Sequence, residues 1–85
     1  MARHRWSRER EIAAEMLRNM RLAASLNQAE VAAALGTPQS HVSKYESGER
    51  GLEMHQIRAV CEACNASLVA FAQEFDERLA ETGRR

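Results

Sequence analysis

Gln39, Ser40 and Lys44 are polar residues within one six-residue stretch, and the last two are four residues apart, as neighbours on one face of a helix are. The glutamine amide offers a donor and an acceptor, which together match the N6 and N7 atoms of adenine. A lysine ammonium favours guanine. The chemistry available here is therefore hydrogen bonding to the edges of bases, unless the three side chains are simply solvated.

A second group of polar side chains suits phosphate oxygens. Gln28 is expected at the amino end of a helix, where its amide and the free backbone N–H groups can together hold one phosphate oxygen. Ser43, Ser47 and Arg50 are further candidates for contacts with a sugar-phosphate backbone. His41 lies near the same face and either touches phosphate or is exposed to solvent. Ordinary surface polarity is the alternative for the others.

The element that must carry these residues is a pair of short helices. Asn27 and Glu30 form a capping box, which predicts that the first helix of this pair begins at residue 27. Gly36 suits the position just past its end, because glycine adopts the left-handed conformation without strain. Thr37 is expected to cap the second helix, with Pro38 at its first helical position. So short a link forces the second helix to turn sharply away from the first.

Helical signals continue on both sides of this pair, and nothing in the sequence predicts a strand. Ser7 is expected to cap an earlier helix, the first of the chain. Asn65 and Ser67 mark the joint between the last two helices of the chain. The expected helices cover residues 8–24, 27–35, 38–47, 54–64 and 68–81. The fourth should bury one stripe, formed by Met54, Ile57, Val60, Cys61 and Cys64. We therefore expect an all-α fold.

Two short helices joined by a tight glycine turn, with small polar residues on the outer face of the second, are the geometry that places one helix in the major groove of DNA. Over residues 17–71 the sequence resembles the Cro and lambda-type phage repressor helix-turn-helix domains. The motifs that carry the resemblance are LNQAE (26–30), LGTPQS (35–40), VSKYESG (42–48) and CNASL (64–68). The resemblance implies a compact five-helix, lambda-repressor-like domain in which the second and third helices form the helix-turn-helix.

The resemblance also implies roles for individual residues. An adenine contact by Gln39 and a phosphate contact by Gln28 are typical of the family. In this family an arginine of the first helix pairs with a glutamate of the third, which implies an ion pair between Arg21 and Glu46 with one guanidinium edge left toward phosphate. Glu46 also needs a partner because the helix dipole disfavours a negative charge at a carboxyl end. An unpaired surface charge is the alternative.

Composition excludes several functions. The 85 residues form one small domain, too short for an elaborate cofactor-binding enzyme, so we expect no catalysis and no cofactor. The charges of the twelve basic and twelve acidic residues cancel, which argues against a protein that coats nucleic acid without regard to sequence.

Cys61 and Cys64 have the spacing of a disulfide or of half a zinc site, but they fall on the buried stripe, and no metal site is expected. The arginine-rich start runs into glutamates rather than an apolar stretch, which predicts a cytoplasmic protein.

Assembly is the last expectation. One short helix reads few base pairs, so we expect a homodimer on a palindromic operator, as in a repressor-like transcriptional regulator of double-stranded DNA. The dimer interface is expected to use some of Phe71, Phe75 and Leu79. The alternative is an antitoxin or other module that binds a partner protein such as a toxin. A single domain is expected over residues 8–81, between a flexible basic arm (1–7), either reaching DNA or solvated, and a frayed C-terminus (82–85).

Overall fold

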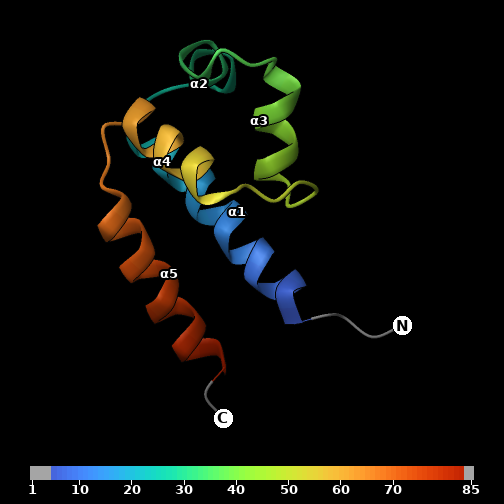
Figure 1. Ribbon diagram of the computed structural model, residues 1–85, viewed down its shortest axis with the longest axis vertical. Helices are drawn as coiled ribbons and strands as arrows, with labels where there is room; N and C mark the ends of the chain where they lie inside the picture. The colour runs from blue at the N-terminus through green and yellow to red at the C-terminus, as the bar shows by residue number, and fades with distance from the viewer. Residues whose placement is uncertain (1–4, 84–85) are drawn as a thin grey trace.

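The computed structural model describes residues 5–83, and the side chains within residues 8–81. Its elements are the helices α1 (Arg5–Ala23), α2 (Gln28–Leu35), α3 (Gln39–Glu46), α4 (Met54–Ala63) and α5 (Leu68–Gly83). In Figure 1, α1 and α5 run side by side, and α2 lies at the end of the molecule opposite the first turns of α1. Residues 5–83 contain no strand, so the expected all-α fold of five helices is confirmed.

The first helix is longer than expected at its amino end. It begins at Arg5, three residues early, and Ser7 lies inside the helix instead of capping it. The reason is that residues 5–7 contain no helix breaker, so the helix extends beyond the first local cap signal. Of the expected basic arm, residues 5–7 belong to α1 and residues 1–4 lie outside the described residues. At the other end, Ser25 takes a left-handed conformation (φ 60°), which the sequence did not signal.

The local signals around α2 are confirmed. Asn27 Oδ1 accepts a hydrogen bond from the backbone N–H of Glu30 (2.7 Å), and Glu30 Oε1 accepts one from the backbone N–H of Asn27 (2.8 Å). Gly36 follows the helix with φ 71°, in the left-handed conformation. The start of α3 was predicted one residue too early, because its N-cap is Pro38 and not Thr37. Thr37 still belongs to the end of α2, since its backbone N–H donates to Ala32 O (2.9 Å).

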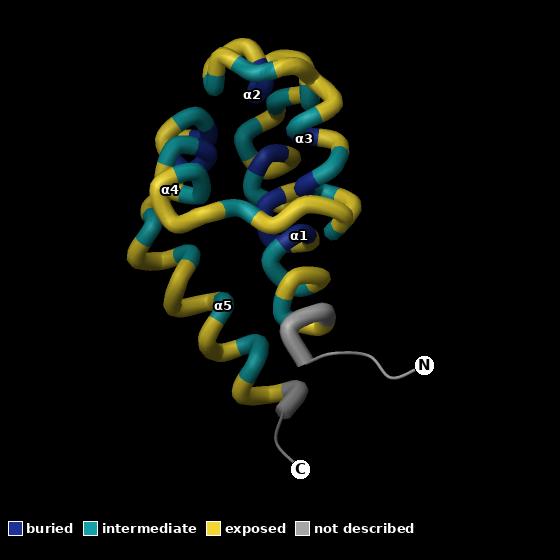
Figure 2. Tube along the Cα trace, turned by 45° about the vertical axis from the view of Figure 1, so that its right-hand side comes forward, coloured by how far each residue is buried: buried dark blue, intermediate teal, exposed yellow. Residues whose placement is uncertain are grey.

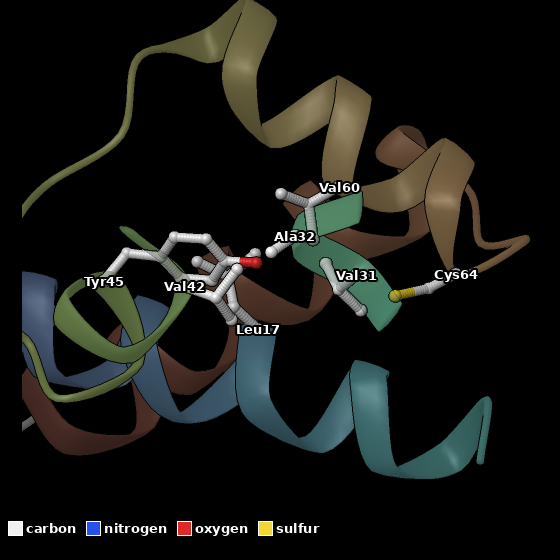
Figure 3. Packing of buried hydrophobic residues seen from close by; sticks show 7 residues of the cluster. All are labelled: Leu17, Val31, Ala32, Val42, Tyr45, Val60 and Cys64. Carbon is white, nitrogen blue, oxygen red and sulfur yellow. The ribbon is translucent and has the colours of Figure 1, made fainter. Parts of the chain in front are cut away.

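The core lies where the first four helices meet, and Figure 3 shows its side chains. Val31 and Val42 have no exposed surface, and Tyr45 is 1% exposed. Burying each aliphatic side chain of this size stabilises the fold by about 1.5–3 kcal/mol. This packing holds the inner face of α2 against α3 and α4, and that of α3 against α1. The buried cluster consists of Leu17, Val31, Ala32, Val42, Tyr45, Val60 and Cys64.

The last two helices, α4 and α5, are joined by a short turn and are less buried than the others. Asn65 is left-handed (φ 57°) and Ser67 Oγ accepts from the backbone N–H of Ala70 (3.1 Å), as predicted for this joint. Met54 was wrongly predicted to be buried: it is 69% exposed, because contact of α4 with the core begins one turn later, at Ile57. Figure 2 shows that buried positions gather in α1–α4, whereas α5 is half-buried or exposed along its described length. None of the described helices has the length and apolar character that crossing a membrane requires.

Candidate nucleic-acid interface

The outer face of α3 is open to solvent. Val42 and Tyr45 hold the inner face of this helix in the core, so side chains on the opposite side have no packing role. Gln39, Ser40 and Ser43 are exposed there, and Lys44 is half-buried. The structure therefore leaves the residues expected to contact bases accessible on a helix that is itself fixed in place. Of the other candidates, Ser47 and Arg50 are exposed, Gln28 is half-buried, and Arg21 is buried.

A buried ion pair braces the carboxyl end of α3 against α1. Arg21 donates two hydrogen bonds to the Glu46 carboxylate, from Nε to Oε2 (2.7 Å) and from Nη2 to Oε1 (2.9 Å). The side chains are 9% and 3% exposed, respectively. The hydrogen bond to Glu46 raises the pKa of Arg21 above its usual value, against the opposing effect of burial. Arg21 Nη1 also donates to Leu26 O (2.9 Å), so the same guanidinium holds the chain entering α2.

The two glutamines at the starts of α2 and α3 are joined to this pair. Gln28 Nε2 donates to Glu46 Oε1 (3.1 Å), and Gln39 Nε2 donates to Gln28 Oε1 (3.4 Å). A continuous chain of hydrogen bonds thus runs from Arg21 through Glu46 and Gln28 to Gln39. This link was not predicted from the sequence, although the signal was available: each glutamine is the first residue of its helix, and they are eleven residues apart.

Arg50 is held beside α3 by a histidine. Arg50 Nη1 lies 2.8 Å from His41 Nδ1, and because an arginine can only donate, the histidine nitrogen is the acceptor. The His41 ring meets the Tyr45 ring edge-on, with centroids 5.4 Å apart. His41 is half-buried rather than fully exposed to solvent, and its Nδ1 is bonded to Arg50. Arg50 is exposed, and its contact with His41 places its guanidinium beside α3.

Ser47, which is expected to contact the sugar-phosphate backbone, also closes the end of α3. Its hydroxyl donates to Lys44 O (2.9 Å) and accepts from the backbone N–H of Glu49 (3.3 Å), which closes the end of α3. Gly48 follows with φ 86°. The side chain of Ser47 remains exposed, so the closing bonds do not remove it from the surface.

The two cysteines lie in the interior. Cys61 is 1% exposed and Cys64 is 7% exposed, and neither forms a disulfide. Burial raises the pKa of both thiols, and Cys64 also raises that of Cys61. Within residues 5–83, no group of three or more His, Cys, Asp and Glu side chains could hold a metal ion. The cysteines therefore act as small apolar residues of the core.

The raised thiol pKa values predict that alkali destabilises the fold. Because the unfolded thiols ionise at their ordinary pKa of about 8.5, unfolding releases protons above that pH, and stability falls as pH rises further. We expect thermal denaturation to show a melting temperature that falls between pH 8 and pH 10. The double variant Cys61→Ala/Cys64→Ala should show a shallower fall over the same range. An equal slope in both proteins would contradict the assignment.

The apolar residues expected at a dimer interface are half-buried within one chain. Phe71 packs against the core cluster, and Phe75 lines a hollow together with Leu17 of α1. Leu79 is also half-buried. The large apolar side chains that are exposed nearby are Leu22 (48%) and Val69 (71%). A groove of ≈ 280 Å³ separates α1 from α5, and its walls include Met20, Ala23, Ala66, Ala70 and Phe71.

Comparison with known proteins agrees with this geometry. The model of the family described as "Helix-turn-helix domain" matches residues 12–73. The clp gene regulator ClgR from C. glutamicum is 25% identical, with a TM-score of 0.76 over 85% of this chain and 94% of its own. The restriction-modification controller protein C.Esp1396I, solved as a tetramer on its natural operator, is 16% identical, with a TM-score of 0.73 over 81% of this chain and 91% of its own. No curated protein matches the chain in sequence.

Proposed function

The chain belongs to the helix-turn-helix domain family of DNA-binding transcription regulators, and from this premise we propose that it is a repressor-like homodimer that recognises an inverted-repeat operator. The observation that carries the proposal is the outer face of α3, which is exposed while its inner face is buried. A helix held in this way can enter the major groove without unfolding. The regulators similar to this chain in structure support the same function.

In the proposed complex, the residues divide into two groups. Gln39, Ser40 and Lys44 contact base edges, because they lie on or beside the exposed face of α3. The second group binds phosphates, which fixes the register of the protein on the duplex without reading sequence. The phosphate group consists of Gln28, Ser43, Ser47 and Arg50. Arg21 was also expected to present one guanidinium edge to phosphate, but all three of its guanidinium nitrogens are bonded to Glu46 and Leu26 and its side chain is buried.

Two copies of the chain would meet through α5. Val69 is exposed on the first turns of this helix, and Leu22 is exposed near the end of α1. The alanines in the groove between α1 and α5 allow close approach of another helix. Phe71 borders the groove, and we place it in the interface together with Phe75 and Leu79 farther along α5. Two symmetry-related α3 helices would then read half-sites about 34 Å apart, or one helical turn.

Selection of bound fragments from random duplex DNA tests the function directly. An enriched inverted repeat is the expected result, because a two-fold dimer reads a two-fold site. Failure to enrich any sequence would overturn the proposal and favour the alternative of a module that binds a partner protein. Sedimentation tests the dimer separately: a monomer at tens of micromolar, or a Val69→Glu variant that still forms dimers, would contradict the interface.

Variants of the two contact groups should behave differently on the selected site. Gln39→Ala should cost about 1–3 kcal/mol of binding free energy and relax one position in each half-site. Arg50→Gln should weaken binding to every sequence alike and reduce the slope of log affinity against log salt by about one for each phosphate that Arg50 neutralises. Fluorescence anisotropy at several salt concentrations measures both effects. If both variants bound all sequences more weakly by the same factor, the division of roles would be wrong.

A further inference from the structure

A hollow of ≈ 500 Å³ is lined by α1, by α5 and by the segment 47–53 that joins α3 to α4. We propose that this hollow binds a small organic anion with an apolar body, and that occupying it opposes DNA binding by engaging Arg50. The volume is within the range of small-molecule sites in proteins, about 300–1,000 Å³. The effect on DNA rests on the function proposed above, whereas the binding of the anion does not.

The floor of the hollow is apolar and belongs to the folded core. Leu17 and Tyr45 are 3% and 1% exposed, and the half-buried Ile57 and Phe75 add to the wall. Ala13 of α1 also lines the hollow, and its short side chain leaves space that a larger one would fill. Apolar groups that enter this space leave water, which favours a ligand with an apolar body.

Two arginines and one glutamate supply the charge of the hollow. Arg10 and Arg50 are exposed, and Glu9 is half-buried. Among the side chains that the structure describes, no carboxylate forms an ion pair with either arginine. Two positive charges against one negative charge leave the hollow positive, so it attracts an anionic group and repels a cationic one.

Gly51 allows Arg10 to approach the backbone beside Arg50. The Nε and Nη2 atoms of Arg10 lie 3.2 Å from the position that a Cβ at residue 51 would occupy. Gly51 does not have the positive φ of Gly36 and Gly48, so its backbone conformation does not call for a glycine. The approach of Arg10 instead leaves little room for a side chain there. Both arginines therefore lie at the same short stretch of the wall, where one anionic group can meet both.

Arg50 connects the hollow to the proposed DNA-binding surface. Its Nη1 atom donates to His41 Nδ1 (2.8 Å), which places the guanidinium beside α3, and the same side chain lines the hollow. An anion in the hollow accepts hydrogen bonds that Arg50 would otherwise donate to a phosphate, and it brings negative charge close to the DNA backbone. The anion should thus weaken DNA binding, and DNA should weaken binding of the anion by the same factor.

A pair of fluorescent probes tests the choice of ligand. 8-Anilinonaphthalene-1-sulfonate carries a sulfonate on an aromatic body, and N-phenyl-1-naphthylamine has the same rings without the sulfonate. We expect the full chain to bind the sulfonate probe more tightly by about 2-fold to 30-fold, the range for two contacts between exposed charges. Arg10→Gln should reduce that ratio, whereas Arg58→Gln, which changes an exposed arginine of α4 outside the hollow, should not. Equal affinities of the wild type for the two probes would overturn the proposal.

Nuclear magnetic resonance locates the bound sulfonate probe. The methyl signals of Leu52 and Ile57, which line the hollow, should shift on its addition, and those of Met20 and Ala23, in the groove between α1 and α5, should not. Ala13→Phe fills the hollow and should abolish the shifts, while circular dichroism establishes that the variant is folded. Wild-type shifts confined to Met20 and Ala23 would contradict the site. So would binding that weakens as the protein concentration rises, because a second copy would then cover the hollow.

The operator selected from random DNA tests the link to DNA binding. A saturating amount of this duplex should lower the affinity of the wild type for the sulfonate probe by about 5-fold to 150-fold, the usual range for coupled sites. Arg50→Gln should bring that factor toward one. An unchanged affinity in the wild type would overturn the effect on DNA binding. If the wild type enriches no sequence while the probe occupies the hollow, the proposed function fails and the anion site stands.

Discussion

Replacing Glu46 by alanine is expected to cost about 3–5 kcal/mol of folding free energy, the range for a buried charge left without its partner. The variant leaves the Arg21 guanidinium in an environment where the side chain is only 9% exposed. It also leaves the Gln28 amide without its acceptor. Urea denaturation followed by circular dichroism measures the loss as a shift of the midpoint at constant slope.

Two controls identify the source of this loss. Glu49→Ala removes an exposed carboxylate three residues later and should change stability by no more than about 0.5 kcal/mol. The double variant Arg21→Met/Glu46→Leu removes both charges and should recover most of the stability, because apolar residues of similar volume can replace a buried pair. If the double variant were as unstable as Glu46→Ala, loss of packing rather than an unpaired charge would be responsible.

The local features that the sequence predicted correctly depend on residues close together in the chain, whereas the pair of Arg21 and Glu46, which are 25 residues apart, was expected from the resemblance. The capping box of Asn27 and Glu30, the left-handed Gly36 and the Ser67 cap each involve backbone within a single turn. The conformational preference of one residue therefore decides the structure there. The inner face of α3 was equally predictable, because Val42 and Tyr45 are three residues apart and the helical period places them together.

The errors at Thr37 and Met54 arose where several elements meet. Thr37 has the chemistry of a helix cap, but its hydroxyl is buried and caps nothing, and its backbone N–H ends α2, so Pro38 stands at the N-cap position. Met54 continues the apolar stripe of α4, but the core does not extend as far as the first turn of that helix. Such outcomes depend on how two helices are placed relative to each other, which periodicity within one helix does not specify.

The same limit applies to the candidate site. Its residue types were recognisable from spacing and from the resemblance to repressors. The contacts of Gln28 with Gln39, and of His41 with Arg50, join segments whose relative position follows only from the packed fold.

Tyr45 and Gln39, one buried and one exposed on the same helix, should separate folding from binding. Tyr45→Ala removes a buried aromatic side chain that is 1% exposed, and a loss of about 3–5 kcal/mol of folding free energy is expected for a substitution of this kind. Gln39→Ala alters an exposed side chain and should change stability by no more than about 0.5 kcal/mol. Thermal denaturation of the two variants beside the wild type measures this contrast.

The order should reverse when DNA binding is measured well below the melting temperature of both variants. Under those conditions the fraction of Tyr45→Ala molecules that remain folded keeps the outer face of α3, so its preference among operator sequences should match that of the wild type. Gln39→Ala, fully folded, should lose its preference at one position in each half-site. A Tyr45→Ala variant with relaxed specificity would show that the inner face also shapes the contact with bases, and a Gln39→Ala variant with unchanged specificity would remove α3 from base recognition.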